Sequence, residues 1–176
     1  MTRRLLIIGL DCASPKLLYE EFREELPTLE MLTSDGLKAE LISSHPPITI
    51  PAWSVMVTGK TPGELGLYGF RHRKPGMYND FYIANSRSVR EPAVWDFLGR
   101  RGLKTIVVGV PPSYPPKPVR GIMIGCFITP GPESRYTFPP TLKREIESRF
   151  GRYIFDVVYR SEDRDRVIRE VWAMTK

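Results

Sequence analysis

The sequence predicts an α/β fold in which helices flank a mostly parallel, doubly wound sheet. Two continuous apolar runs of strand length, residues 5–10 and 105–110, fit strands that are buried on both faces. Segments with helix start and stop signals lie between them. The alternation of such strands and helices is typical of parallel sheets.

The first elements follow directly from local signals. The run at residues 5–10 ends at Asp11, and Ser14-Pro15 then reads as an N-cap and first residue of a helix that turns Leu17, Leu18 and Phe22 inward. Pro27 starts a second helix, which Asp35-Gly36 closes. Residues 38–44 form a plausible second strand that leads into a proline-rich stretch.

That stretch, residues 46–70, reads PPITIPAWSVMVTGKTPGELGLYGF. Pro51 suits a first helical position, and Thr58-Gly59 suits the end of the same helix after Val57. Residues 67–90 combine aromatic, glycine and basic residues without a clear period, so we expect an irregular excursion there.

The second half repeats the alternation. Ser88 to Glu91 resembles a capping box before a helix that Gly102 ends, and that helix carries Val94, Trp95, Phe97 and Leu98. Strands follow at 105–110 and 121–125, separated by the extended, proline-rich loop 111–118. Further helices are expected at 140–150 and after Ser161, the latter with Val167, Ile168, Val171 and Trp172 on one face. Because that apolar stripe is still running at residue 176, we expect the sequence to be the front part of a larger protein.

Composition indicates a folded, soluble protein with one α/β domain over residues 1–176. Apolar residues make up 41% and charged residues 26%, and the 176 residues suffice for a substantial core. There is no glutamine and there are only two asparagines, a balance typical of thermophilic proteins. Cys12 and Cys126 are expected to be reduced and buried rather than bonded or metal-bound.

The charge and hydropathy of the sequence argue against nucleic-acid and membrane partners. The net charge of +6 comes from scattered basic residues, which favours a solvated surface over a specific nucleic-acid site. No segment approaches the length of a membrane span, and the run at residues 5–10 is too short for a signal peptide. We therefore expect a cytoplasmic protein without a membrane partner.

Two polar residues stand where a parallel sheet binds ligands, beyond the carboxyl ends of strands. Asp11 is either a cap or a metal ligand. Thr49, near the start of a helix, is either a cap or a hydroxyl placed beside unpaired backbone N–H groups that bind phosphate. Local physics leaves both alternatives open.

Taken together, GLDCASPKLL, the proline-rich stretch and the β-α-β frame resemble the alkaline phosphatase superfamily, in its type I phosphodiesterase and nucleotide pyrophosphatase branch. Within this branch they look like its archaeal and bacterial predicted phosphohydrolase or phosphomutase members. It covers all 176 residues but matches only the amino-terminal portion of the family, so it implies an alkaline-phosphatase-like sheet that is incomplete relative to the family. Thr58-Gly59, Pro62 and Gly66 match the family segment T-G-x-x-P-x-x-x-G, whereas Ala52 stands where relatives commonly carry asparagine.

The resemblance implies a function and its residues. Thr49 would be the covalent nucleophile, and Asp11 and Thr49 would be two ligands of a divalent metal, zinc in most of the family, at a two-metal site. Arg71 and Arg73 would steer a small phosphate-ester or nucleotide substrate. The only histidines, His45 and His72, precede the region where the family's remaining ligands occur, so the metal site is incomplete in this sequence.

Two hypotheses follow for the function. The first is metal-dependent hydrolysis of phosphodiester or pyrophosphate bonds through Thr49. The second is a catalytically silent, truncated domain that binds an anion, forms a homo-oligomer or associates with a missing carboxy-terminal half. Nucleic-acid binding is a weaker third reading, since it rests on net charge and aromatic content alone.

Overall fold

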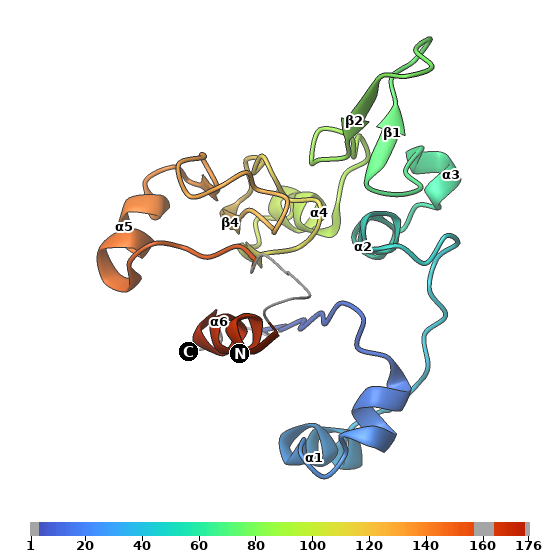
Figure 1. The fold of residues 1–176 in the computed structure, drawn as a ribbon, viewed down its shortest axis with the longest axis vertical. Helices are drawn as coiled ribbons and strands as arrows, with labels where there is room; N and C mark the ends of the chain where they lie inside the picture. The colour runs from blue at the N-terminus through green and yellow to red at the C-terminus, as the bar shows by residue number, and fades with distance from the viewer. Residues whose placement is uncertain (1–3, 157–163, 175–176) are drawn as a thin grey trace. The chain divides into compact units, whose positions relative to one another are not determined.

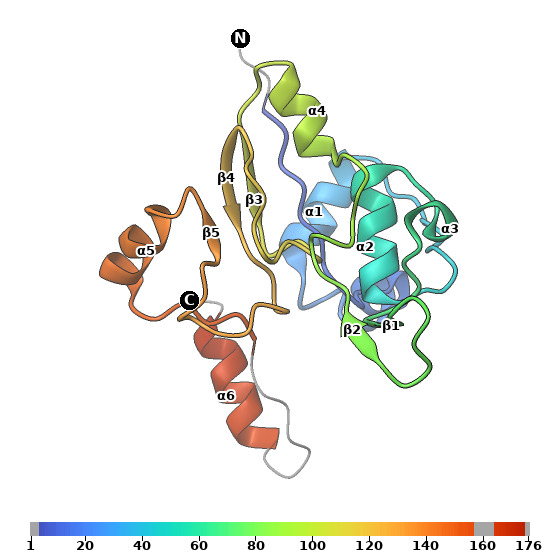
Figure 2. The ribbon, with the colours of Figure 1, turned by 90° about the horizontal axis from the view of Figure 1, so that it is seen from above.

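The computed structural model describes residues 4–156 and 164–174. The chain divides at Ser43 into two compact units, and each is described by itself. Figure 1 labels the helices α1 to α6 and the strands β1, β2 and β4, and Figure 2 also labels β3 and β5. The expected single domain over residues 1–176 stays a prediction.

The first unit is helical. A π-helical turn, η1 (Leu17–Glu21), lies where the first helix was predicted, and Ser14 Oγ accepts a hydrogen bond from the Leu17 N–H at 3.4 Å. Helix α1 (Pro27–Asp35) starts at a proline and ends before Gly36, as its signals indicate.

The predicted strands at residues 5–10 and 38–44 are wrong for this structure, which leaves both segments without regular secondary structure. Their apolar side chains are exposed, with Leu5 at 85% and Leu41 at 90%. A strand of this kind forms only where a neighbouring strand takes its backbone N–H and C=O groups, and the described residues of the first unit contain no strand to do so. The apolar pattern alone does not supply that neighbour.

The second unit is a mixed α/β structure. A three-stranded sheet has the order β3-β4-β5, with β3 (Thr105–Val108) parallel to β4 (Gly121–Ile124) and β4 antiparallel to β5 (Thr137–Phe138). These strands lie side by side in Figure 2. A separate antiparallel hairpin pairs β1 (Arg71–Arg73) with β2 (Phe81–Ile83), within residues 67–90 where we expected an irregular excursion.

The α/β class is therefore confirmed, but the predicted mostly parallel, doubly wound sheet is not what the structure contains. Among residues 4–156 and 164–174 the strands form three pairs, and of these β3 with β4 is parallel whereas the other two are antiparallel. The physical reason is the missing pairing of residues 5–10 and 38–44, the two runs that would have extended the parallel part.

The helices of the second unit lie near predicted positions, with the exception of α3, which was not predicted. They are α2 (Thr49–Thr58), α3 (Pro62–Leu65), α4 (Val94–Arg100), α5 (Leu142–Phe150) and α6 (Arg164–Met174). Helix α4 starts later than predicted because Asp96, rather than Ser88, provides its cap, accepting a hydrogen bond from the Ala93 N–H at 2.8 Å. Residues 161–163, which precede α6, lie outside the described residues.

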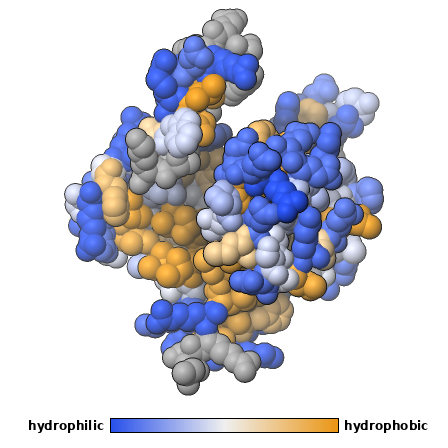
Figure 3. Space-filling view, turned by 90° about the horizontal axis from the view of Figure 1, so that it is seen from below, coloured by the Kyte–Doolittle hydropathy of each residue, from blue (hydrophilic) through white to orange (hydrophobic). Residues whose placement is uncertain are grey.

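A small core supports the start of α2. Ile50, Leu67, Ala84 and Val89 form one buried cluster, with Leu65 packed against it. Elsewhere hydrophobic residues, drawn in orange, occupy part of the surface in Figure 3. Among the described residues, no helix is both long enough and apolar enough to cross a bilayer.

Candidate active site

Thr49 is the first residue of α2. Ile48 before it has extended backbone, with ψ at 145°, and its carbonyl accepts the first helical hydrogen bond from the Ala52 N–H at 3.0 Å. The helix thus begins two residues earlier than Pro51, which we predicted as the first helical residue. Thr49 is half-buried, and its neighbours Ile50 and Pro51 are buried.

The start of α2 places Thr49 in a region of partial positive charge. The first N–H groups of an α-helix have no acceptor inside the helix, and the helix dipole places partial positive charge at the same end. Pro51 carries no N–H, so the donors at this end belong to the residues around the Thr49 hydroxyl. An anion or a developing negative charge is favoured there.

Buried contacts fix the helix that carries Thr49. The Ile50 side chain is 0% exposed within the cluster of Leu67, Ala84 and Val89. One turn further on, the buried Ser54 hydroxyl donates to the Ile50 carbonyl at 2.7 Å. The backbone at Thr49 is therefore fixed by the burial of the next residue, Ile50, while the Thr49 side chain lies at the boundary of the core.

The segment T-G-x-x-P-x-x-x-G has a structural explanation. Gly59 ends α2 and Gly66 ends α3, and both adopt left-handed backbone, with φ of 69° and 66°. Between them, Thr61 and Glu64 form a capping box at the start of α3. The hydrogen bond from the Thr61 N–H, followed by those from the Thr61 side chain and Lys60, lowers the pKa of the Glu64 carboxyl. This segment therefore shapes the turn that brings Leu67 into the cluster beside Ile50.

Arg71 and Arg73 lie on one face of the β1–β2 hairpin, opposite Ile83 and Phe81 in the register. The Arg71 guanidinium carbon lies 4.9 Å from the centre of the Phe81 ring, and that of Arg73 lies 4.5 Å from the centre of the Tyr78 ring. Cation–π contacts of this kind orient an arginine while leaving its N–H donors available.

The hairpin is anchored to the same core as α2. The Ala84 N–H donates to the Phe70 carbonyl at 2.8 Å, and the Ala84 side chain belongs to the cluster that buries Ile50. The structure thus connects Thr49 and the two arginines through one buried cluster. The sequence alone did not predict this cluster, although Ile50, Leu67 and Ala84 are all small or apolar residues in or near the motif.

The two histidines have separate positions. His72 is on the other strand face from the arginines, stacked on Tyr82 at 5.5 Å with its Nε2 3.0 Å from the Gly69 carbonyl oxygen. His45 is exposed in the loop before α2. His72 therefore has a structural role in the hairpin.

Asp11 belongs to the first unit, so the structure describes it apart from Thr49. It is exposed, in a turn whose next residue, Cys12, has a φ of 60°. Cys12 is also exposed, so its predicted burial is wrong, whereas Cys126 is buried as expected and both thiols are free.

A metal site is not complete among the described residues. No group of three or more histidine, cysteine, aspartate or glutamate side chains there is arranged to hold a metal ion. Zinc takes four ligands in most protein sites. The metal-ligand roles expected for Asp11 and Thr49 stay predictions.

Comparison with known proteins agrees with the motif. Residues 5–175 match the family described as type I phosphodiesterase / nucleotide pyrophosphatase. The comparisons with curated proteins and with solved structures gave no match.

Proposed function

The chain belongs to the type I phosphodiesterase and nucleotide pyrophosphatase family, and from this membership we propose that it hydrolyses phosphodiester or pyrophosphate bonds with Thr49 as the nucleophile. The observation that carries the proposal is the position of Thr49, at the positive end of α2, in a chain that matches the family over residues 5–175. Family membership implies phosphate-ester substrates and a dependence on metal ions.

The proposed reaction has two steps. The substrate phosphoryl group lies at the start of α2, where backbone N–H groups and the helix dipole offset its negative charge. The Thr49 oxygen forms a bond to phosphorus while the bond to the leaving alkoxide or phosphate breaks, and the hydroxyl proton leaves to solvent or to the leaving group. Water then attacks phosphorus, releases phosphate or a phosphomonoester, and restores the Thr49 hydroxyl.

The metal that the family implies would take Asp11 and Thr49 as two of its ligands. When bound, it would supply a lower pKa for the threonine hydroxyl, which is otherwise a poor nucleophile. We propose zinc, at one position of a two-metal site.

Arg71 and Arg73 have a supporting role in this proposal. Their guanidinium groups lie on one face of the hairpin, held over Phe81 and Tyr78, and the hairpin is anchored beside Ile50. They attract the anionic substrate and increase its rate of arrival rather than taking part in bond breaking. Loss of either should raise KM more than it lowers kcat.

The test is turnover of bis-p-nitrophenyl phosphate by the purified chain with zinc or manganese. We expect metal-dependent turnover that Thr49→Ala abolishes and Thr49→Ser partly keeps. Thr58→Ala is the matched control, because it removes a hydroxyl from the other end of the same helix, where Thr58 Oγ1 donates to the Ser54 carbonyl. Turnover that survives in Thr49→Ala, or a wild-type chain without metal-dependent turnover, would contradict the proposal.

A second candidate is a catalytically silent domain that associates with itself. The observation that favours it is the exposure of large apolar residues in segments without regular structure, Leu41 at 90% and Ile42 at 89% among them. Sedimentation at several concentrations distinguishes the two, since self-association without turnover would support this candidate and a monomer would remove it.

A further inference from the structure

A hollow of about 480 Å³ lies along α4, between that helix and the segment 117–120 that leads into β4. Its size is within the range of small-ligand sites. None of the residues discussed as catalytic lines it. It is therefore a candidate binding site distinct from the start of α2.

Hydrogen bonds near both ends of the segment 117–120 fix its position along α4. At one end the Lys117 ammonium donates to the Val89 carbonyl at 2.7 Å. At the other, Arg120 Nε donates to the Gly102 carbonyl at 2.9 Å, and a Cβ atom at Gly99 would already be in contact with the Arg120 Cβ at 3.4 Å. The segment 117–120 thus runs alongside α4 at close approach.

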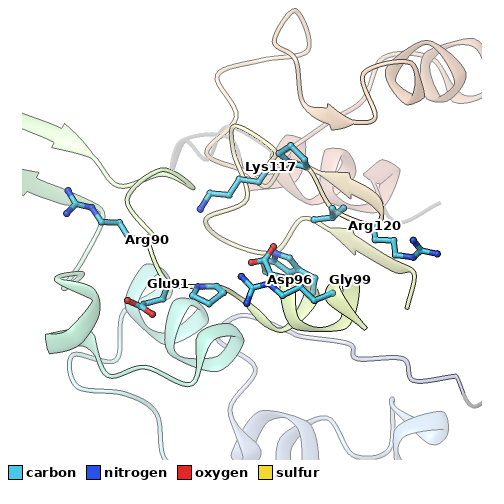
Figure 4. A pocket seen from close by; sticks show the side chains of 11 residues that line it. Arg90, Glu91, Asp96, Gly99, Lys117 and Arg120 are labelled. Atoms are coloured by element: carbon cyan, nitrogen blue, oxygen red, sulfur yellow. The ribbon is translucent and has the colours of Figure 1, made fainter. Parts of the chain in front are cut away.

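Basic side chains occupy both ends. Arg90 and Lys117 belong to the first, and Arg100 and Arg120 to the second. Figure 4 shows Arg90 and Arg120 on opposite sides of the pocket, with Asp96 between them. The three arginines are exposed, and each side chain is long enough to turn towards an anion. Helix α4 has seven residues, which at 1.5 Å per residue separates the two ends by about 10 Å.

The middle of the hollow has a different chemistry. Asp96 and Glu91 present carboxylates there, and Trp95 presents a half-buried indole ring. One oxygen of Asp96, Oδ2, accepts a hydrogen bond from the Ala93 N–H at the start of α4. Burial lowers the pKa of the Lys117 ammonium at the first end of the hollow, and the charge of Asp96 partly opposes this effect.

A ligand that fits must have anionic groups at its two ends and hydrogen-bond donors between them. Phosphate groups suit the arginine and lysine ends, because guanidinium groups bind phosphate through paired hydrogen bonds. Hydroxyl groups suit the carboxylates, and the apolar face of a sugar ring suits the indole. A nucleotide carries its charge at one end only and leaves the other basic end unmatched.

We propose that the hollow along α4 binds a sugar bisphosphate, with one phosphate between Arg90 and Lys117 and the other between Arg100 and Arg120. The sugar hydroxyls then donate to Asp96 and Glu91. The site is independent of the reaction proposed for Thr49, so its occupancy does not require turnover.

The test is isothermal titration calorimetry on the full chain, in the presence of a metal chelator. We expect fructose 1,6-bisphosphate to bind at least about tenfold more tightly than fructose 6-phosphate, because a charge-assisted hydrogen bond is lost with each phosphate, and fructose itself not to bind. The double variant Arg100→Gln/Arg120→Gln should reduce bisphosphate affinity to that of the monophosphate.

Arg101→Gln is the matched control, since Arg101 adjoins Arg100 in sequence but does not line the hollow, and it should leave the dissociation constant unchanged. Circular dichroism confirms that each variant is folded. Equal affinity for bisphosphate, monophosphate and inorganic phosphate would overturn the proposal. So would unchanged binding in the double variant, or an equal loss of binding in Thr49→Ala, which would place the ligand at α2.

Discussion

The core beneath Thr49 can be tested by shortening one side chain, Ile50. Its side chain is 0% exposed and packs in the cluster with Leu67, Ala84 and Val89. Ile50→Ala removes three carbon atoms, worth about 0.8 kcal/mol each in lost burial, or about 2.4 kcal/mol in all. The cavity left behind raises the expected loss of unfolding free energy to about 2–5 kcal/mol.

Ile48→Ala is the matched control, because Ile48 is two residues away and 39% exposed. It should cost less than about 1 kcal/mol. Urea unfolding followed by circular dichroism measures both variants, and the slope should remain that of the wild type if only stability changes. Equal losses in the two variants would refute the assignment of Ile50 to the core that holds α2.

Two further predictions concern stability. Burial, assisted by Glu147, raises the pKa of Tyr136 from 10.0 to about 12, so its neutral form stabilises the fold fully below pH 10 and this contribution is lost as pH rises towards 12. At 1.36 kcal/mol per pKa unit the loss is about 3 kcal/mol, and urea unfolding between pH 9 and 12 should show it in the wild type but not in Tyr136→Phe, whereas an identical pH dependence would disprove it. Gly59→Ala should cost about 1–2 kcal/mol by thermal unfolding, because φ is 69° there and the space around it is open. Gly131→Ala, equally open but without positive φ, should cost little, and equal costs would contradict this reason.

Local signals predicted the helices well. Pro27 and Gly36 bound α1, and Gly59 ends α2, because a cap depends only on residues within one turn. The strands β3 and β4 were also predicted, since both runs are apolar and of strand length, whereas their pairing with each other comes from the structure. The start of α4 was missed because the Ser88 hydroxyl accepts a hydrogen bond from the Asn85 N–H in the preceding turn, whereas Asp96 caps the helix.

Long-range features were not predictable in the same way. Residues 5–10 have the composition of a buried strand, but a strand requires a partner that the run itself does not specify. The β1–β2 hairpin has strands of only three residues, too short for a periodic pattern. The hollow along α4 was missed because Arg90, Arg100, Lys117 and Arg120 come from segments far apart in sequence, and each alone reads as a solvated charge.

For the candidate site, the sequence identified Thr49 and its helix but not the cluster beneath them. The resemblance identified Thr49 as the hydroxyl to consider. The structure explains how Ile50, Ser54 and Gly59 fix the helix whose first residue is Thr49. The roles of Asp11, Arg71 and Arg73 stay predictions, because the contacts that would assign them involve a substrate and a metal.

The central claim is that Thr49 attacks phosphorus, and the most direct measurement is the mass of the peptide that contains it. The chain is incubated with bis-p-nitrophenyl phosphate and zinc, quenched in acid, digested and analysed by mass spectrometry. We predict that the peptide containing Thr49 is heavier by one p-nitrophenyl phosphoryl group and that fragmentation locates this group on Thr49. The Thr49→Ala variant should give no such modified peptide. Turnover without modification of Thr49, or modification of Thr58 or Ser54 instead, would contradict the account.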